Sequence, residues 1–276
     1  MAKLSGKMRY LQAKKLHNNH ARRLVTASAL ILVILLAIYL LPAIHLVTGL
    51  CLIAYQGLDE WCHLAIPLGI FPQKKIHYYT LGIQLGALAM GLITISQSTQ
   101  IILQFIAPLG CALSYLYLQS SDKAQKSLGI WLIGLVLQSC GWYEAILLCQ
   151  TNISLLVYLS LTTAVADTAG YYVGKNISLY TSKPWPLVSP SKTYEGSIAM
   201  CIMPILITLI TAPHNISLSL YIGSLALLGD LFISSAKRLA HVKDCGSILP
   251  GHGGVLDRLD SHLMVWTMHG ALRVFG

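Results

Sequence analysis

Carboxylate and cationic side chains alternate through one segment near the C-terminus of the 276-residue chain. The segment starts at Gly229-Asp230 and ends in a glycine-rich stretch at residues 250–260. Carboxylates suit Mg²⁺, lysine and arginine suit phosphates, and glycines let the backbone approach a polyphosphate closely. A solvated loop with local ion pairs is the competing interpretation, but it would not require Asp230 inside an apolar run. The chemically capable side chains here are Asp230, Ser234, Ser235, Lys237, Arg238, Lys243, Asp244, His252, Asp257, Arg258 and Asp260. His252 is either a base, a ligand or a hydrogen-bonded loop residue.

A second candidate is Asp167, which falls near the end of an apolar run expected to form a helix. An ionisable residue in a membrane-spanning helix is costly and is therefore a functional hypothesis by default. The alternative is an aspartate that hydrogen-bonds a neighbouring helix.

A third candidate is the segment from Ser189 to Gly196, which reads Ser-Pro-Ser-Lys-Thr-Tyr-Glu-Gly. Ser191 or Thr193 could cap the helix that follows, and Glu195 suits its first turn. A helix N-terminus beside Lys192 and several hydroxyls also suits a phosphate. A plain helix cap explains the hydroxyls and the glutamate equally well, so both interpretations stand. The segment lacks the glycines of a Walker A loop.

The composition shows what must position these residues. Hydrophobic residues make up 55% of the chain and charged residues 11%, whereas a soluble domain carries about 25% charged residues. This excludes an ordinary soluble enzyme and a disordered chain, and seven scattered cysteines do not suggest a disulfide scaffold. The net charge of +9 is typical of cytoplasmic loops of a membrane protein rather than of nucleic-acid binding.

The sequence predicts an all-α, polytopic integral membrane protein. A spanning helix needs about 20 mostly apolar residues. Eight such spans are expected at about residues 24–41, 44–58, 78–96, 101–119, 128–149, 153–173, 197–212 and 218–236, and a ninth, short one at 261–276. The first span is expected to be an uncleaved anchor rather than a signal peptide, because a second span follows it directly.

Cations set the expected orientation. The first 23 residues carry seven lysines and arginines, which places the N-terminus in the cytoplasm. With alternating spans, every later lysine and arginine except Arg273 also falls on the cytoplasmic side. We therefore divide the chain into a basic cytoplasmic segment, 1–23, and a single membrane domain, 24–276, with the candidate chemistry at 160–262. A bacterial plasma membrane is the expected location.

Taken together, the three segments resemble the phosphatidate cytidylyltransferase family, the CDP-diacylglycerol synthases. The family signature runs Ser, Lys-Arg, four residues, Lys-Asp, then Pro-x-His-Gly-Gly, a hydrophobic pair, Asp-Arg, a hydrophobic residue and Asp. This chain matches it without a gap from Ser234 or Ser235 to Asp260. Residues 167–171 and 189–196 resemble the upstream motifs, in the same order, and Glu60-Trp61 is a weaker match further upstream.

The resemblance implies that CTP and phosphatidate react to give CDP-diacylglycerol and pyrophosphate at the cytoplasmic membrane face. It implies Mg²⁺, with a monovalent cation such as K⁺ left open beside it, and Asp230 and Asp257 as metal ligands. Lys192, Lys237, Arg238, Lys243 and Arg258 would hold phosphates. The predicted catalytic residues are Asp230, Asp257, Lys237, Arg238, Lys243, Asp244 and His252. The predicted substrate-binding residues are Ser189, Ser191, Lys192, Thr193, Gly253, Gly254, Arg258 and Asp167. The predicted partners are CTP, phosphatidate or a related lipid phosphate, and the lipid bilayer, with a homodimer left open.

One departure from the family pattern bears on activity. Most members carry a glutamate three residues after the Asp230 position, where this chain has Ile233. The loss of a carboxylate near the expected metal site predicts weak activity or an altered lipid substrate. The alternatives are a CTP transferase for a prenyl or ether lipid phosphate, and an inactive scaffold or transporter on the same fold. A transporter would place ionisable residues near the middle of the membrane, whereas here they gather at one face.

Overall fold

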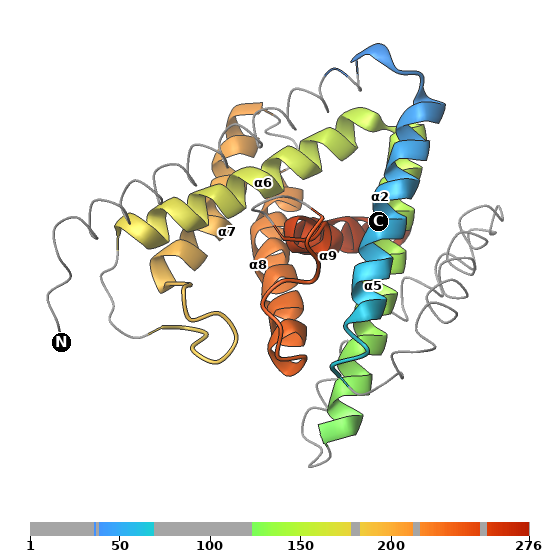
Figure 1. Cartoon of the computed structure of the whole chain (residues 1–276). Helices are drawn as coiled ribbons and strands as arrows, with labels where there is room; N and C mark the ends of the chain where they lie inside the picture. The colour runs from blue at the N-terminus through green and yellow to red at the C-terminus, as the bar shows by residue number, and fades with distance from the viewer. Residues whose placement is uncertain are drawn as a thin grey trace, which may run out of the picture.

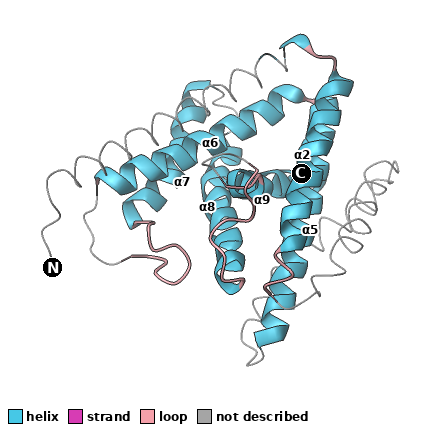
Figure 2. Cartoon of the chain, in the orientation of Figure 1, coloured by secondary structure: helices cyan, strands magenta, loops and turns pink. Residues whose placement is uncertain are grey.

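The computed structural model describes residue 36 and residues 39–68, 123–177, 183–211, 216–248 and 253–275. Within these ranges the long regular elements are all helices, which confirms the all-α prediction for this part of the chain (Figures 1 and 2). The six helices are α2 (Ala43–His63), α5 (Lys123–Thr151), α6 (Ile153–Asn176), α7 (Tyr194–Thr211), α8 (Ile216–Leu239) and α9 (Leu256–Phe275).

Each span expected in the described ranges corresponds to one of these helices. Three stretches are long and apolar enough to cross a membrane: Gly129–Thr151 in α5, Ile153–Asn176, which is all of α6, and Tyr194–Thr211, which is all of α7. The expected spans at 78–96 and 101–119, the basic segment 1–23 and nearly all of 24–41 lie outside the described residues.

The start of α9 corrects the sequence interpretation. Asp257, Arg258 and Asp260 were expected in a glycine-rich loop, but α9 begins at Leu256 and contains all three. The helix starts early because the partial positive charge of its N-terminus is matched by Asp257 in its first turn. As a result, the side chains of these residues project from a rigid element.

Helix α9 is the central element of the packing. It contacts α2, α5, α6 and α8, while α6, α7 and α8 form a layer to one side and α2 packs along α5 (Figure 1). At Gly229 the backbones of α8 and α9 come so close that a Cβ atom would lie 2.6 Å from the Asp260 carbonyl oxygen. This close approach brings Asp230 on α8 next to the first turns of α9.

Candidate active site

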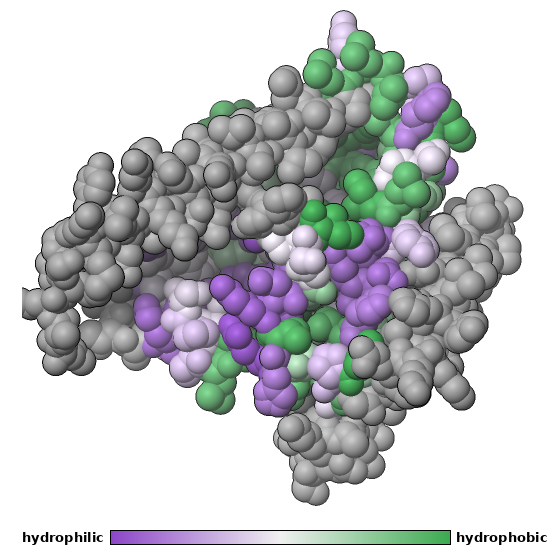
Figure 3. All heavy atoms as spheres, viewed as in Figure 1, coloured by the Kyte–Doolittle hydropathy of each residue, from purple (hydrophilic) through white to green (hydrophobic). Residues whose placement is uncertain are grey.

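The ends of four helices enclose a pocket of about 580 Å³. Helices α6 and α8 end there, and α7 and α9 begin there, so segments far apart in the sequence contribute to one wall. The lining residues are Asp167, Gly170, Tyr171, Gly174, Lys175, Ser189, Ser191, Lys192, Thr193, Gly196, Ser197, Met200, Asp230, Lys237, Asp244, Asp257, Arg258, Asp260 and Ser261. Figure 3 shows hydrophilic residues gathered across the middle of one face of the molecule. The lining includes five carboxylates and four cations, which suits a ligand that carries phosphates together with a metal ion.

The start of α7 contributes a cation from a well-ordered turn. The buried hydroxyl of Thr193 accepts a hydrogen bond of 3.1 Å from the Gly196 amide, so Thr193 caps the helix as the sequence suggested. The preceding Lys192 forms an ion pair of 2.5 Å with Asp230 on α8. Asp230 also accepts a 3.1 Å hydrogen bond from the Ser234 hydroxyl, one turn further along α8. The cap therefore fixes Lys192 opposite the predicted metal ligand Asp230.

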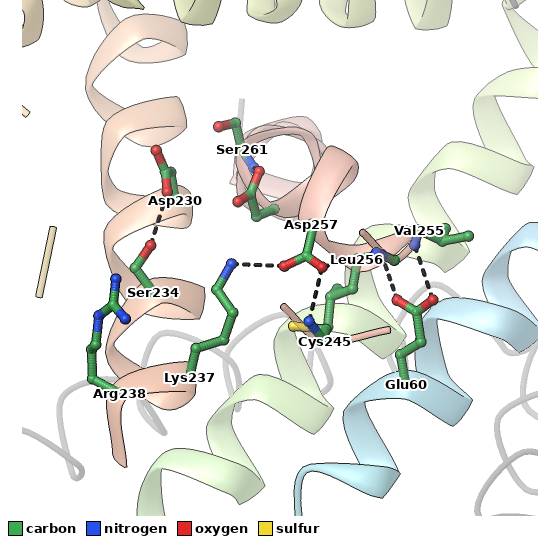
Figure 4. Close-up of polar contacts among 12 residues, drawn as sticks. Glu60, Asp230, Ser234, Lys237, Arg238, Cys245, Val255, Leu256, Asp257 and Ser261 are labelled. Atoms are coloured by element: carbon green, nitrogen blue, oxygen red, sulfur yellow. Dashed lines mark hydrogen bonds and ion pairs between the residues drawn. The ribbon is translucent and has the colours of Figure 1, made fainter. Parts of the chain in front are cut away.

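Asp257 lies at the centre of a second set of contacts (Figure 4). One of its oxygens accepts a hydrogen bond of 2.7 Å from Lys237 Nζ, and the other accepts from the amides of Cys245, at 2.8 Å, and Gly254, at 2.9 Å. Gly253, the residue just before Gly254, adopts a φ of 81°, a conformation that disfavours any residue with a Cβ atom. The turn therefore depends on glycine to place two N–H groups around the carboxylate.

The charges of Asp257 and Lys237 stabilise each other. Burial alone would raise the pKa of Asp257, but the hydrogen bonds from Lys237 and the Gly254 amide outweigh it and hold the pKa below its usual value. Burial alone would lower the pKa of Lys237, and the hydrogen bond to Asp257 reverses this and raises the pKa. Both groups are therefore charged at neutral pH.

Asp167 and Asp260 also lie on the acidic side of the pocket. Asp167 accepts a hydrogen bond of 3.1 Å from the buried hydroxyl of Ser261 on α9. Asp260 is buried and its carboxyl group lies close to those of Asp167 and Asp230, so that each of these groups disfavours ionisation of the others. A cation bound in the pocket would favour the ionised form of these groups.

The donor set fits a hard divalent cation that is shared with a substrate. In the described ranges, no group of three histidine, cysteine, aspartate or glutamate side chains is close enough to hold a metal by itself. Mg²⁺ does not need such a cage, because it usually takes one or two carboxylates and completes its shell with water and substrate phosphates. Asp230 and Asp257 supply that number of carboxylates in one pocket.

Most of the predicted site residues are brought together. The pocket is lined by Asp167, Ser189, Ser191, Lys192, Thr193, Asp230, Lys237, Asp244, Asp257 and Arg258. Gly253 and Gly254 form the turn behind Asp257 rather than the lining, and His252 lies outside the described residues.

Two predicted phosphate ligands lie elsewhere. Arg238 is exposed, and its Nε donates a 3.1 Å hydrogen bond to the carbonyl of Val188. Figure 4 shows it on a different side of α8 from Lys237, because adjacent helical residues are about 100° apart. Lys243 is exposed in the segment after α8 and does not line the pocket.

The pocket also includes residues that the sequence analysis did not assign to the site. On α6 these are Gly170, Tyr171, Gly174 and Lys175. They follow Asp167 at helical spacings of three, four, seven and eight, so the period of the helix places all of them on one face. That helical spacing from Asp167 was the signal in the sequence that could have identified these residues as part of the site.

Ile233, the departure from the family pattern, is not part of the pocket lining. It is 4% exposed and belongs to the hydrophobic core. Together with Gln138 on α5 it lines a separate cavity of about 10 Å³, close to the space that one water molecule needs. The isoleucine therefore replaces a carboxylate at a packed position between α5, α8 and α9.

The helices and the pocket define a class: a membrane protein whose described part is helical and whose polar pocket combines carboxylates, lysines and a capped helix N-terminus. Comparison with known proteins narrows the class. Residues 21–275 match the model of the cytidylyltransferase family, and the chain belongs to that family.

Curated relatives agree with this assignment. A phosphatidate cytidylyltransferase of Bacillus subtilis is 39% identical over 125 residues, which are 42% of this chain and 46% of the relative. Those of Staphylococcus saprophyticus and Staphylococcus aureus are 36% and 37% identical over 119 residues, 40% of this chain and 45% of each relative. The chain thus matches somewhat less than half the length of these relatives.

Proposed function

We propose that the protein transfers a cytidylyl group from CTP to phosphatidate, giving CDP-diacylglycerol and pyrophosphate. The observation that carries this proposal is the single pocket in which all three motif segments meet. The matched relatives carry the name phosphatidate cytidylyltransferase, which supports the choice of substrates. These relatives match 42% of this chain or less, so the proposal for the whole chain rests on the pocket as well.

The chemistry requires positioning and charge neutralisation more than acid–base catalysis. The phosphate monoester of phosphatidate has a second pKa near ~6, so its oxygen is already a nucleophile at neutral pH. That oxygen attacks the α-phosphorus of CTP, a new P–O bond forms, and the bond to the β-phosphate breaks as pyrophosphate leaves. No group in the pocket is required to remove a proton.

The following roles are proposed for side chains that line the pocket. Asp230 and Asp257 hold Mg²⁺, which when bound neutralises charge on phosphate oxygens. Lys192 and Lys237 each exchange a carboxylate partner for a phosphate oxygen when CTP enters, because each now pairs with one of those aspartates. Arg258 and the hydroxyls of Ser189 and Ser191 bind further phosphate oxygens. A monovalent cation beside Mg²⁺ stays a prediction.

The membrane arrangement belongs to the same proposal. We place eight or nine spans in a bacterial plasma membrane, with the N-terminus and the pocket on the cytoplasmic side. Support comes from the lysines of the pocket, since cations gather on the cytoplasmic side of membrane proteins. The exposed apolar residues Leu161, Val165, Ile198 and Ile202 on α6 and α7 suit contact with lipid. A homodimer stays a prediction.

The decisive assay uses the purified chain, Mg²⁺, CTP labelled in its α-phosphate, and a panel of lipid phosphates that includes phosphatidate, a prenyl phosphate and an ether analogue. We expect label in the lipid fraction with phosphatidate, and none when Mg²⁺ is removed by chelation. Label found only on the prenyl or ether lipid would show that this lipid phosphate, and not phosphatidate, is the substrate. Absence of labelled lipid throughout would contradict the enzymatic function.

A further inference from the structure

A buried glutamate on a distant helix holds the start of α9. Glu60, near the C-terminal end of α2, is 4% exposed. Its two oxygens accept hydrogen bonds from the Val255 amide, at 3.0 Å, and the Leu256 amide, at 2.9 Å, across a separation of 195 residues or more (Figure 4). Glu60 does not line the pocket, and no salt bridge in the described part of the chain includes it.

These bonds divide the amides at the start of α9 between two carboxylates. The first N–H groups of a helix have no partner within the helix and need acceptors from elsewhere. Asp257 accepts from Gly254, and Glu60 accepts from the next two amides, Val255 and Leu256. Because Glu60 satisfies these two donors, Asp257 keeps one oxygen directed toward Lys237 and the pocket.

The backbone is fitted closely around the Glu60 carboxylate. A Cβ atom on the buried Gly254 would lie 2.3 Å from one carboxylate oxygen, and one on Gly246 would lie 2.5 Å from the other. These approaches are far shorter than van der Waals contact, so a side chain at either position would push the Glu60 carboxylate out of its place. Glu60 therefore binds the turn before Asp257 and lies directly against the segment after α8.

Glu60 is itself held by its neighbour Trp61, which is fully buried. The indole of Trp61 donates a hydrogen bond of 3.0 Å to the Trp131 carbonyl on α5, and the Trp131 indole donates one of 3.3 Å to the Trp61 carbonyl. The Trp61 ring also stacks on Phe232 of α8, with ring centroids 6.2 Å apart. The carboxylate is thus anchored to the packed interface of α2, α5 and α8.

We infer that Glu60 is a positioning residue for the metal ligand Asp257, acting through the Gly254–Leu256 backbone. This inference rests on the proposed function, because it takes Asp257 as a ligand of Mg²⁺. Glu60 touches neither the pocket nor a substrate and is therefore not catalytic. Partners that orient metal ligands commonly contribute about 10- to 100-fold to metal affinity or activity.

The test compares Glu60→Gln, Glu60→Asp and the matched control Asp59→Asn in the full chain. Asp59 is the adjacent carboxylate on α2 and pairs with His63 instead of α9. Glu60→Gln turns an NH₂ group toward a backbone donor, whereas Glu60→Asp keeps the charge and shortens the side chain. The probe is Mn²⁺, titrated into purified protein and followed by electron paramagnetic resonance, together with amide hydrogen exchange of residues 253–260.

We expect Glu60→Gln to weaken Mn²⁺ binding about tenfold and to accelerate exchange of residues 253–260, with Glu60→Asp intermediate and Asp59→Asn within about twofold of wild type. In the activity assay, the Mg²⁺ concentration for half-maximal rate should rise while the rate at saturating Mg²⁺ stays nearly unchanged. A merely structural role would lower the rate at every Mg²⁺ concentration without shifting that midpoint.

Unchanged Mn²⁺ affinity in Glu60→Gln would overturn the inference, and so would an equal loss in Asp59→Asn or a wild-type chain that binds no Mn²⁺. Failure of the proposed function has a different signature. In that case the wild-type chain forms no labelled lipid, yet Mn²⁺ binding and hydrogen exchange still decide whether Glu60 positions Asp257.

Discussion

Two clusters of charged side chains in the described part of the chain differ in how completely their charges are paired. In the pocket, several carboxylates and cations line an open volume of about 580 Å³. Between α5 and α9, by contrast, the single carboxylate of Glu144 is 1% exposed. It accepts hydrogen bonds from His269 Nδ1, at 3.0 Å, and from Arg273 Nε and Nη2, at 3.2 and 3.1 Å.

This difference in charge pairing distinguishes the pocket, which is a candidate ligand site, from the Glu144 cluster, which is a structural contact. Both oxygens of Glu144 accept hydrogen bonds from side chains of α9, which ties the two helices together. In the pocket, Asp167, Asp230 and Asp260 lie close together beside space that a ligand can fill, and each disfavours ionisation of the others. A charged residue inside a membrane protein therefore indicates function most strongly when its charge is incompletely compensated beside a cavity.

The largest expected effect on catalysis is that of Asp257→Asn. The substitution keeps the shape of the side chain and removes the charge that we assign to Mg²⁺. We expect the rate of cytidylyl transfer to fall at least about 100-fold, since even outer partners of metal ligands contribute up to that much. Measurement of label transfer, with folded protein quantified by size-exclusion chromatography, checks this. A wild-type rate in Asp257→Asn would show that Asp257 is not a metal ligand.

Lys237 and Arg238 provide the next comparison, because they are adjacent and equally charged. Lys237→Gln should lower the rate about 10- to 100-fold through the loss of a charge-assisted contact to phosphate. Arg238→Gln should lower it less than about threefold, because Arg238 contacts the Val188 carbonyl outside the pocket. Initial rates at saturating CTP distinguish the two. Equal losses would mean that Arg238 turns into the pocket when substrate binds.

Glu144→Gln should affect stability instead of catalysis. Removing one partner of a buried ionic cluster costs about 3 kcal/mol or more, so the unfolding temperature in detergent should fall. The rate per folded molecule should stay within about twofold of wild type, because the cluster does not contact the pocket. A rate loss without a change in unfolding temperature would show that this cluster takes part in catalysis.

The smallest expected effect is that of Ile233→Val. The substitution removes one methylene group from a packed core position, which costs about 0.5–1.5 kcal/mol of stability. The Mg²⁺ dependence of the rate should not change, because Ile233 does not line the pocket. A titration of the rate with Mg²⁺ checks this, and a shifted midpoint would connect position 233 to the metal site.

The sequence predicted the helices and most of the pocket, because apolar runs and local motifs are readable one segment at a time. Thr193 is an example: its place before a helix with Glu195 in the first turn indicated a cap, and the structure contains that cap. The family resemblance, which the matched family confirms, then grouped segments that are distant in the sequence.

Contacts between distant helices could not be predicted in this way. The bonds from Val255 and Leu256 to Glu60 join residues about 195 positions apart, and nothing in the local pattern around Glu60 indicates its partner. Two of the departures from prediction near the site were local in origin. The glycines before Asp257 suggested a loop where α9 begins, and the Lys237-Arg238 pair was assigned one role although a helix turns its members to different sides.

The most direct test of the central claim compares Asp257→Asn and Glu144→Gln in one label-transfer experiment with α-labelled CTP, phosphatidate and Mg²⁺. The rate is expressed per folded molecule, so that stability and catalysis are separated. We predict that Asp257→Asn retains about 1% of the wild-type rate or less, and that Glu144→Gln retains at least about half. Equal rates for the two variants, or the reverse order, would contradict the assignment of the pocket as the active site.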